Sequence, residues 1–102
     1  MYTQAFLNNG LMTGRLIGYS KSAYREQHPE NEVYFNCNIF ILGEGKIWYG
    51  DLDVTKDGET LKTIAGDLGT PLYILRESDG RFGNEELSDS EIIKRSVKRI
   101  EI

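Results

Sequence analysis

Two β-rich runs of similar length, separated by a glycine-containing break, constrain the fold of this chain more than any other feature. The runs are Val33–Leu42 and Lys46–Val54, and Gly43-Glu44-Gly45 lies between them. A two-residue loop that begins with glycine is typical of a type II′ hairpin turn. The sequence therefore predicts a β-hairpin with Gly43-Glu44 as its loop, and this loop fixes which residues face each other.

The predicted pairing gives the hairpin two faces of different character. On the apolar face the pairs are Ile39 with Trp48, Cys37 with Gly50, Phe35 with Leu52, and Val33 with Val54. On the mostly polar face they are Phe40 with Ile47, Asn38 with Tyr49, Asn36 with Asp51, and Tyr34 with Asp53. Side chains alternate along a strand, so a slip by one residue would mix the two faces. The pattern therefore favours this register.

The N-terminal part of the chain predicts a second hairpin and a short helix. Asn9-Gly10 is a strong signal for a tight turn, because both central residues of a type I′ turn need positive φ. We expect strands at about Tyr2–Asn8 and Leu11–Ser20. A short helix over Ser22–Gln27 is then predicted, with Ser22 as its cap and Pro29 ending it.

An amphipathic helix and a strand are predicted to follow the central hairpin. Leu61, Ile64, Ala65 and Leu68 form one apolar stripe at helical spacing. We expect Thr55 or Asp57 to cap the start of this helix and Gly69 to follow its end. Pro71 then opens an apolar strand over Leu72–Glu77.

The C-terminal quarter carries weaker signals. Ser88-Asp89-Ser90-Glu91 has the spacing of a capping box, which indicates a short helix. Val97–Ile102 fits a helix or an edge strand equally well. The whole pattern predicts one α+β domain spanning residues 1–102. Its single, mainly antiparallel sheet is built from two N-terminal hairpins plus a later strand, with one or two helices packed on one face.

Composition excludes several classes of protein. One Cys and one His supply neither a disulfide framework nor a His- or Cys-rich metal site, so we expect no metal or cofactor. No apolar run is long enough to span a membrane, and the first residues do not read as a signal peptide, so we expect a cytoplasmic protein that does not bind membranes. The net charge of −4 argues against nucleic acid as a partner. The basic cluster of Lys94, Arg95, Lys98 and Arg99 is diluted by neighbouring acids.

The polar face of the central hairpin is the main candidate site. It carries Tyr34, Asn36, Asn38, Tyr49, Asp51 and Asp53. Asn and Asp are depleted in strands because their side chains compete for backbone hydrogen bonds. Tyr and Asn provide contact area and adaptable hydrogen bonds at interfaces. We therefore predict a binding face here; the alternative is a solvated outer face, or one covered by a terminal segment.

Two short motifs point to other chemistry. Asp51-Leu52-Asp53-Val54-Thr55 resembles the first motif of haloacid-dehalogenase-type phosphatases, and this resemblance implies Asp51 as nucleophile and Asp53 as acid/base beside Mg²⁺. Asp67 and Asp79 do not form the late acidic pair of that family. The alternative is that Asp53 or Thr55 caps the following helix and Asp51 is solvated. Arg76 and Arg81 are candidates to grip a phosphate or carboxylate, or else belong to a solvated turn with local ion pairs.

Two further arrangements of residues have both a functional and a structural interpretation. Asp53–Glu59 resembles the opening of an EF-hand calcium loop, but Ile64 stands where that loop needs a bidentate Glu. Cys37 with His28 as its base is a possible nucleophile, although we expect Cys37 to face the core as a small hydrophobic residue.

No motif assembles a nucleophile, a base and an orienting group. The sequence therefore favours a small non-catalytic binding protein with a regulatory or inhibitory role. Its partner is another protein or a second copy of the chain, bound through the Asn/Asp/Tyr face and the neighbouring sheet edge. The alternatives are a metal-dependent enzyme that acts on a phosphorylated or nucleotide substrate through Asp51 and Asp53, and a module that binds a small polar ligand or nucleotide.

Overall fold

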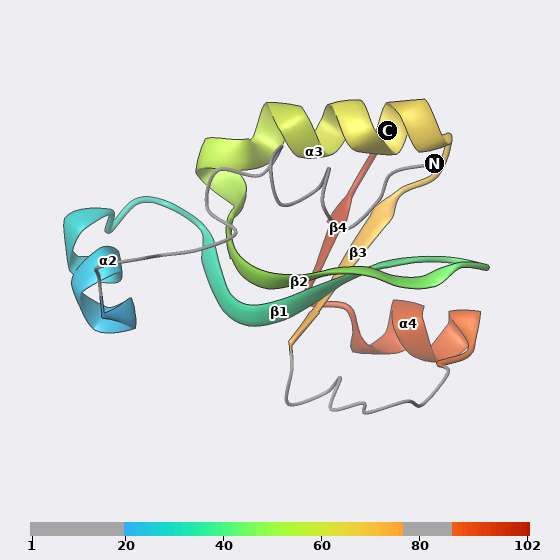
Figure 1. The fold of residues 1–102 in the computed structure, drawn as a ribbon, viewed down its shortest axis with the longest axis horizontal. Helices are drawn as coiled ribbons and strands as arrows, with labels where there is room; N and C mark the ends of the chain where they lie inside the picture. Colours follow the sequence, from blue (N-terminus) through green and yellow to red (C-terminus); the bar gives the residue numbers. More distant parts are fainter. Residues whose placement is uncertain (1–19, 77–86) are drawn as a thin grey trace.

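A computed structural model of the chain describes residues 20–76 and 87–102 (Figure 1). Within these residues the elements are α2 (Lys21–Gln27), β1 (Val33–Ile41), β2 (Gly45–Asp53), α3 (Val54–Leu68), β3 (Leu72–Arg76), α4 (Asp89–Arg95) and β4 (Lys98–Ile100). The predicted N-terminal hairpin and Arg81 lie outside the described residues. The described elements confirm the α+β class.

The strands form one antiparallel sheet of four strands in the order β2-β1-β3-β4. The predicted central hairpin is β1–β2, and the predicted later strand is β3. The sequence of the C-terminal segment fits either a helix or a strand. In the structure this segment forms the short edge strand β4. Two segments far apart in sequence, β1 and β4, therefore flank β3.

The predicted hairpin register is correct at its centre and wrong by one residue toward both ends. Cys37 pairs with Gly50, Asn38 with Tyr49 and Ile39 with Trp48, as expected. Toward the open end Tyr34 pairs with Leu52, and toward the turn Phe40 pairs with Lys46. At each shift, one strand has one residue more than the other between two consecutive pairs, which is a β-bulge.

The turn explains one of these shifts. Ile41 already pairs with Gly45, and the N–H of Glu44 donates to the carbonyl of Ile41 at 3.1 Å. Gly43 then occupies the third turn position with φ 85°, as in a type II turn. The loop is therefore longer than the predicted Gly43-Glu44, and Ile47 is the extra residue that restores the pairing.

The second shift is a bulge at Phe35 and Asn36, which together lie opposite Asp51. Asn36 has φ 51°, a left-handed conformation that Asn tolerates better than most residues. Its backbone N–H donates to Oδ1 of Asp51 at 2.8 Å. This bond satisfies a backbone donor that the bulge removes from the regular ladder.

The conformation of Asn36 predicts a residue-specific stability cost. Replacing Asn36 by Val lowers the free energy of unfolding by about 1–2 kcal/mol, because a β-branched side chain is strained at positive φ. The matched control Asn36→Gly changes it by less than about 1 kcal/mol, since Gly adopts this conformation freely. Urea unfolding measures both values. Equal stabilities of the two variants would contradict a left-handed Asn36.

The main core lies between the sheet and α3. The predicted stripe residues Leu61, Ile64 and Ala65 pack on Ile39 and Trp48, together with Cys37, Leu52, Leu72 and Ile74. Gly69 ends the helix with φ 72° and donates its N–H to the carbonyl of Ala65, as predicted. The apolar residues at the centre of the hairpin and the apolar stripe of α3 therefore pack together in one core.

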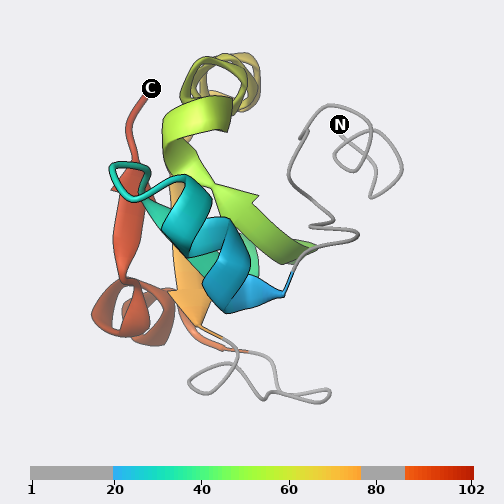
Figure 2. The same cartoon turned by 90° about the vertical axis from the view of Figure 1, so that its left-hand side faces the viewer.

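The opposite face of the sheet carries a second, smaller core under α4. Phe40, Tyr73 and Leu75 pack there against Ile92. Figure 1 shows α3 on one side of the sheet and α4 on the other, and Figure 2 shows the same layers from the end where α2 lies. The prediction that the helices pack on one face is wrong for α4, because β3 presents apolar side chains to both sides.

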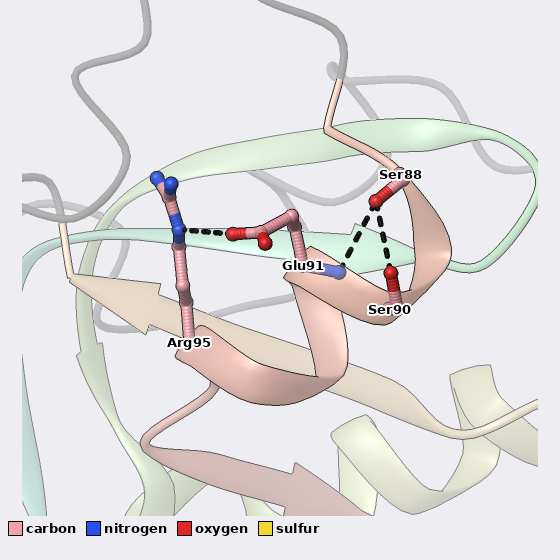
Figure 3. A network of polar contacts seen from close by, with 4 residues as sticks. All are labelled: Ser88, Ser90, Glu91 and Arg95. Atoms are coloured by element: carbon pink, nitrogen blue, oxygen red, sulfur yellow. Dashed lines mark hydrogen bonds and ion pairs between the residues drawn. The ribbon is translucent and has the colours of Figure 1, made fainter.

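Local contacts fix the short helices. Ser88 caps α4 by accepting from the N–H of Glu91 at 3.3 Å, as the predicted capping spacing requires, and Glu91 pairs with Arg95 at 2.9 Å (Figure 3). Helix α2 begins earlier than predicted, because Ser20 rather than Ser22 accepts from the N–H of Ala23. None of the helices within residues 20–76 and 87–102 has the length and apolar character needed to cross a membrane.

Candidate binding surface

The structure divides the predicted polar face into three groups of residues. Asn36, Asn38, Tyr49 and Asp51 stay together on the side of the sheet opposite α3. Asp53 is enclosed between α2 and the start of α3, and Tyr34 packs against the α3 core. The bulge at Asn36 causes the split, because it reverses the alternation of side chains along β1 on either side of it.

Asp53 holds three parts of the chain together. Its side chain is 0% exposed. Its carboxylate accepts from the hydroxyl of Tyr24 at 2.7 Å, from Nδ2 of Asn31 at 2.9 Å and from the N–H of Lys56 at 3.0 Å. Asp53 is thus the N-cap of α3, as in the non-catalytic interpretation of its motif, and it also anchors α2 to the end of the sheet.

These contacts set the ionisation of Asp53. Burial by itself raises the pKa of its carboxyl. The hydrogen bonds from Asn31, Tyr24 and the backbone of Lys56, together with the nearby His28, outweigh burial and hold the pKa below its ordinary value. Asp53 is therefore a buried carboxylate that is engaged by donors from α2, from the segment before β1 and from the first turn of α3.

Tyr34 and Arg76 belong to the other side of the sheet. The hydroxyl of Tyr34 donates to Glu32, and burial with this bond raises the pKa of Tyr34 to about 12. Arg76 ends β3 opposite Cys37, which faces the α3 core, and its charge acts on Tyr34. The sequence predicts Arg76, Asn36 and Asn38 as binding residues. The structure places Arg76 on the other side of the sheet from the two asparagines.

We call the group that remains together the polar strip: Asn36, Asn38, Tyr49 and Asp51. The described contacts of α2 with the sheet lie at one end of the strip, at Phe35 and Asp53, and those of α4 lie at the other, at Phe40. Tyr49 is 42% exposed, and its hydroxyl lies 3.5 Å from Oδ1 of Asn36. Within the strip, Tyr49 is therefore exposed and Asn36 and Asp51 are half-buried, so these three side chains reach the surface.

Asn38 is the unusual member of the polar strip. It is only 1% exposed, and its Nδ2 has no hydrogen-bond partner among the described residues. A buried donor without an acceptor costs about 1–3 kcal/mol, so such groups are rare in folded proteins. An apolar residue at this site, between Tyr49 and Leu75 on the neighbouring strands, would avoid that cost. Asn38 therefore places a buried amide donor in the sheet whose acceptor does not lie among the described residues.

Three cations frame the polar strip. The ammonium of Lys21 and the guanidinium of Arg25 lie over the ring of Phe35, at 5.7 and 4.8 Å from its centre. The ammonium of Lys46 lies 5.9 Å from the centre of the Tyr49 ring. Sequence analysis missed these residues. The i, i+4 spacing of Lys21 and Arg25 on the predicted helix was the available signal.

The geometry does not support the catalytic readings of the motifs. The carboxylate of Asp53 accepts hydrogen bonds from Tyr24, Asn31 and Lys56. Asp51 lies in an antiparallel hairpin, where it accepts from the backbone N–H of Asn36. The residues read as a calcium loop instead form the first turns of α3. Among the described residues, no group of three His, Cys, Asp or Glu side chains is placed to hold a metal ion.

Cys37 and His28 have separate structural roles. Cys37 is buried in the α3 core, as predicted, and its thiol lies 3.3 Å from the carbonyl of Gly50. Burial, with the nearby Asp51, raises the pKa of the thiol to about 12, so it is not a thiolate at neutral pH. His28 stacks on Tyr24, with 4.4 Å between ring centres.

The basic cluster near the C-terminus is divided between two elements. Arg95 pairs with Glu91 on α4, Lys98 on β4 pairs with Glu32 at 3.3 Å, and Arg99 pairs with Glu101. These pairs neutralise much of the positive charge locally. The contrast with the cations around the polar strip is clear, since Lys21, Arg25 and Lys46 have no carboxylate partner among the described residues.

Comparison of the chain with models of protein families, with curated proteins and with solved structures finds no match.

Proposed function

We propose that this protein is a non-catalytic binding protein and that its partner is a protein chain that contacts the polar strip. The observation that carries this proposal is Asn38, a buried amide donor with no acceptor among residues 20–76 and 87–102, next to the exposed Tyr49. A contact that supplies an acceptor to such a group accounts for its presence in the middle of a sheet.

The character of the surface also supports a protein partner. Tyr is enriched at protein interfaces because its ring gives a large apolar contact while its hydroxyl makes hydrogen bonds. Tyr49 is the exposed aromatic residue of the strip, and Asn36 next to it offers adaptable amide groups. Cations at both ends of the strip provide the charged rim that commonly surrounds such a contact.

Photo-crosslinking from Tyr49 tests this proposal. The photo-reactive residue p-benzoylphenylalanine replaces Tyr49 in one variant and Lys62, on the outer surface of α3, in a control. We expect a discrete protein adduct from position 49 and none from position 62 when the protein is irradiated in the cells that contain it. The mass of the adduct distinguishes a different protein from a second copy of the 11.6 kDa chain.

Affinity measurements with the captured partner complete this test. Tyr49→Ala weakens binding by about tenfold or more, because loss of a central interface Tyr commonly costs more than 1 kcal/mol. The control Lys62→Ala leaves the affinity unchanged. The proposal fails if both crosslinking positions give the same adducts, or if Tyr49→Ala binds like the unmodified protein.

A further inference from the structure

The cations around the polar strip point to the chemistry of its partner. Each of them rests on an aromatic ring rather than in an ion pair: Lys21 and Arg25 on Phe35, and Lys46 on Tyr49. Glu26 and Glu44, the exposed acids on the same helix and in the turn before β2, form no ion pair with them among the described residues. No carboxylate within residues 20–76 and 87–102 therefore competes with an anion that approaches these three charges.

The centre of the polar strip has the opposite preference. Asp51 is half-buried there, and one of its oxygens accepts from the N–H of Asn36. A second carboxylate directly above Asp51 is disfavoured by like-charge repulsion. Asn38 beside it offers an amide N–H, which an uncharged carbonyl oxygen satisfies. The strip thus favours negative charge at its two ends and a neutral acceptor at its middle.

The spacing of the cations limits the size of the ligand. Phe35 carries the first two cations. Lys46 is paired with Phe40, and its ammonium lies over Tyr49, which is paired with Asn38. The two ends are therefore three to five strand residues apart, or roughly 10–17 Å at about 3.3 Å per residue. An extended peptide covers that span with the same number of residues.

From these observations we infer that the polar strip binds an extended acidic peptide. Its carboxylates lie three to five positions apart, next to Lys21 and Arg25 at one end and Lys46 at the other, and an uncharged backbone or amide oxygen between them accepts from Asn38. The inference rests on the proposed function and adds the chemical class of the segment that is bound.

A peptide fits this surface better than a single-stranded nucleic acid. Bases bind such surfaces by stacking on free aromatic rings, but here the rings of Phe35 and Tyr49 already carry cations. A phosphate backbone also places negative charge at every step, which includes the position of Asp51.

Fluorescence anisotropy tests the inference with defined probes. The probes are a fluorescein-labelled peptide GEEGNGEEG, its analogue GQQGNGQQG and a labelled oligothymidine. We expect the Glu peptide to bind saturably, the Gln peptide to bind about tenfold more weakly or not at all, and the oligothymidine to bind more weakly than the Glu peptide. Added salt weakens binding of the Glu peptide, since its contacts are largely charge pairs.

Variants locate the binding of the Glu peptide on the strip. The double replacement of Lys21 and Arg25 by Gln, and Lys46→Gln alone, each weaken it by roughly two- to fivefold, as expected when exposed ion pairs are lost. The matched control Lys62→Gln removes one positive charge from the outer surface of α3 and leaves binding unchanged. An equal loss in the control would show that only net charge matters, and this would overturn the inference.

The outcomes separate the ligand class from the proposed function. Equal binding of the Gln peptide, stronger binding of oligothymidine, or no binding of the Glu peptide up to millimolar protein each overturns the acidic-peptide inference. If crosslinking from position 49 still captures a protein, the proposed function stands and only the ligand class fails. If that crosslinking also fails, the acidic-peptide inference and the proposed function are both wrong.

Discussion

Replacing Asp53 by Ala lowers the free energy of unfolding by about 3–5 kcal/mol, the largest effect expected from a single polar substitution in this chain. The change removes the N-cap of α3 and leaves the hydroxyl of Tyr24 and the amide of Asn31 without their acceptor. A cap alone contributes about 1 kcal/mol, and hydrogen bonds to a charged acceptor contribute more than neutral ones. Chemical unfolding monitored by circular dichroism measures the loss.

Two companion variants keep this prediction testable even if Asp53→Ala does not fold. Tyr24→Phe removes only one of the donors and lowers the free energy of unfolding by about 1–2 kcal/mol. Glu59→Ala changes an exposed acid on the same helix and stays within about 0.5 kcal/mol of the unmodified protein. A Tyr24→Phe variant as stable as Glu59→Ala would show that Asp53 does not anchor α2.

The lowered pKa of Asp53 gives the same contact a pH signature. The folded-state pKa lies below that of the unfolded chain, so the unfolded state takes up the proton first as the pH falls. The stabilisation by the Asp53 carboxylate is complete above the ordinary Asp value of about 4 and is lost as the pH falls through the lower folded-state pKa. Asp53→Asn keeps a capping side chain but lacks this titration, so its stability falls less steeply over that acid range.

Replacing Asn38 by Leu has the opposite sign: it raises the free energy of unfolding by about 1–3 kcal/mol. The substitution removes the buried Nδ2, which has no acceptor in the described part of the chain, and places apolar atoms on the same branched side-chain framework beside Phe40 and Leu75. The same variant binds the partner more weakly, because the amide donor of the strip is lost. Thermal or urea unfolding and partner affinity are measured on one protein sample.

Asn38→Asp serves as the matched control for this prediction. It preserves the shape of the side chain but replaces the donor by a carboxylate in a buried position, so it lowers stability. A Leu variant that is less stable than the unmodified protein would mean that Asn38 supports the fold through a contact of its own. A stable Leu variant with full affinity would remove Asn38 from the binding surface.

The sequence was informative where local patterns and tertiary packing agree. The apolar alternation of the hairpin and the stripe at Leu61, Ile64 and Ala65 describe the same buried face, so both were predicted. The capping spacing at Ser88 was also sufficient. Binding by the candidate residues themselves is untested and stays a proposal.

The division of the candidate site was not predictable from alternation alone. A period-two pattern places Tyr34, Asn36 and Asp53 on one face only if the strand is regular, and the bulge at Asn36 breaks that regularity. Its φ depends on the bond to Asp51, a contact between strands that the local sequence does not encode. The engagement of Asp53 likewise depends on Tyr24, which is distant in sequence.

The position of α4 could have been predicted from the apolar run in β3. Leu72, Tyr73, Ile74 and Leu75 are consecutive apolar residues, and all four are buried. A strand of this kind is covered on both faces, whereas a strand with one solvated face alternates. The run therefore indicates a layer on each side of the sheet.

The short edge strand β4 limits how the described sheet can grow. It has three residues, and Lys98 and Arg99 within it are held in ion pairs with Glu32 and Glu101. A strand from a second molecule added at this edge would gain few backbone hydrogen bonds and would strip water from both charge pairs. Strand addition at β4 is thus discouraged, and copies of the chain can meet at high concentration without extending the sheet from this side.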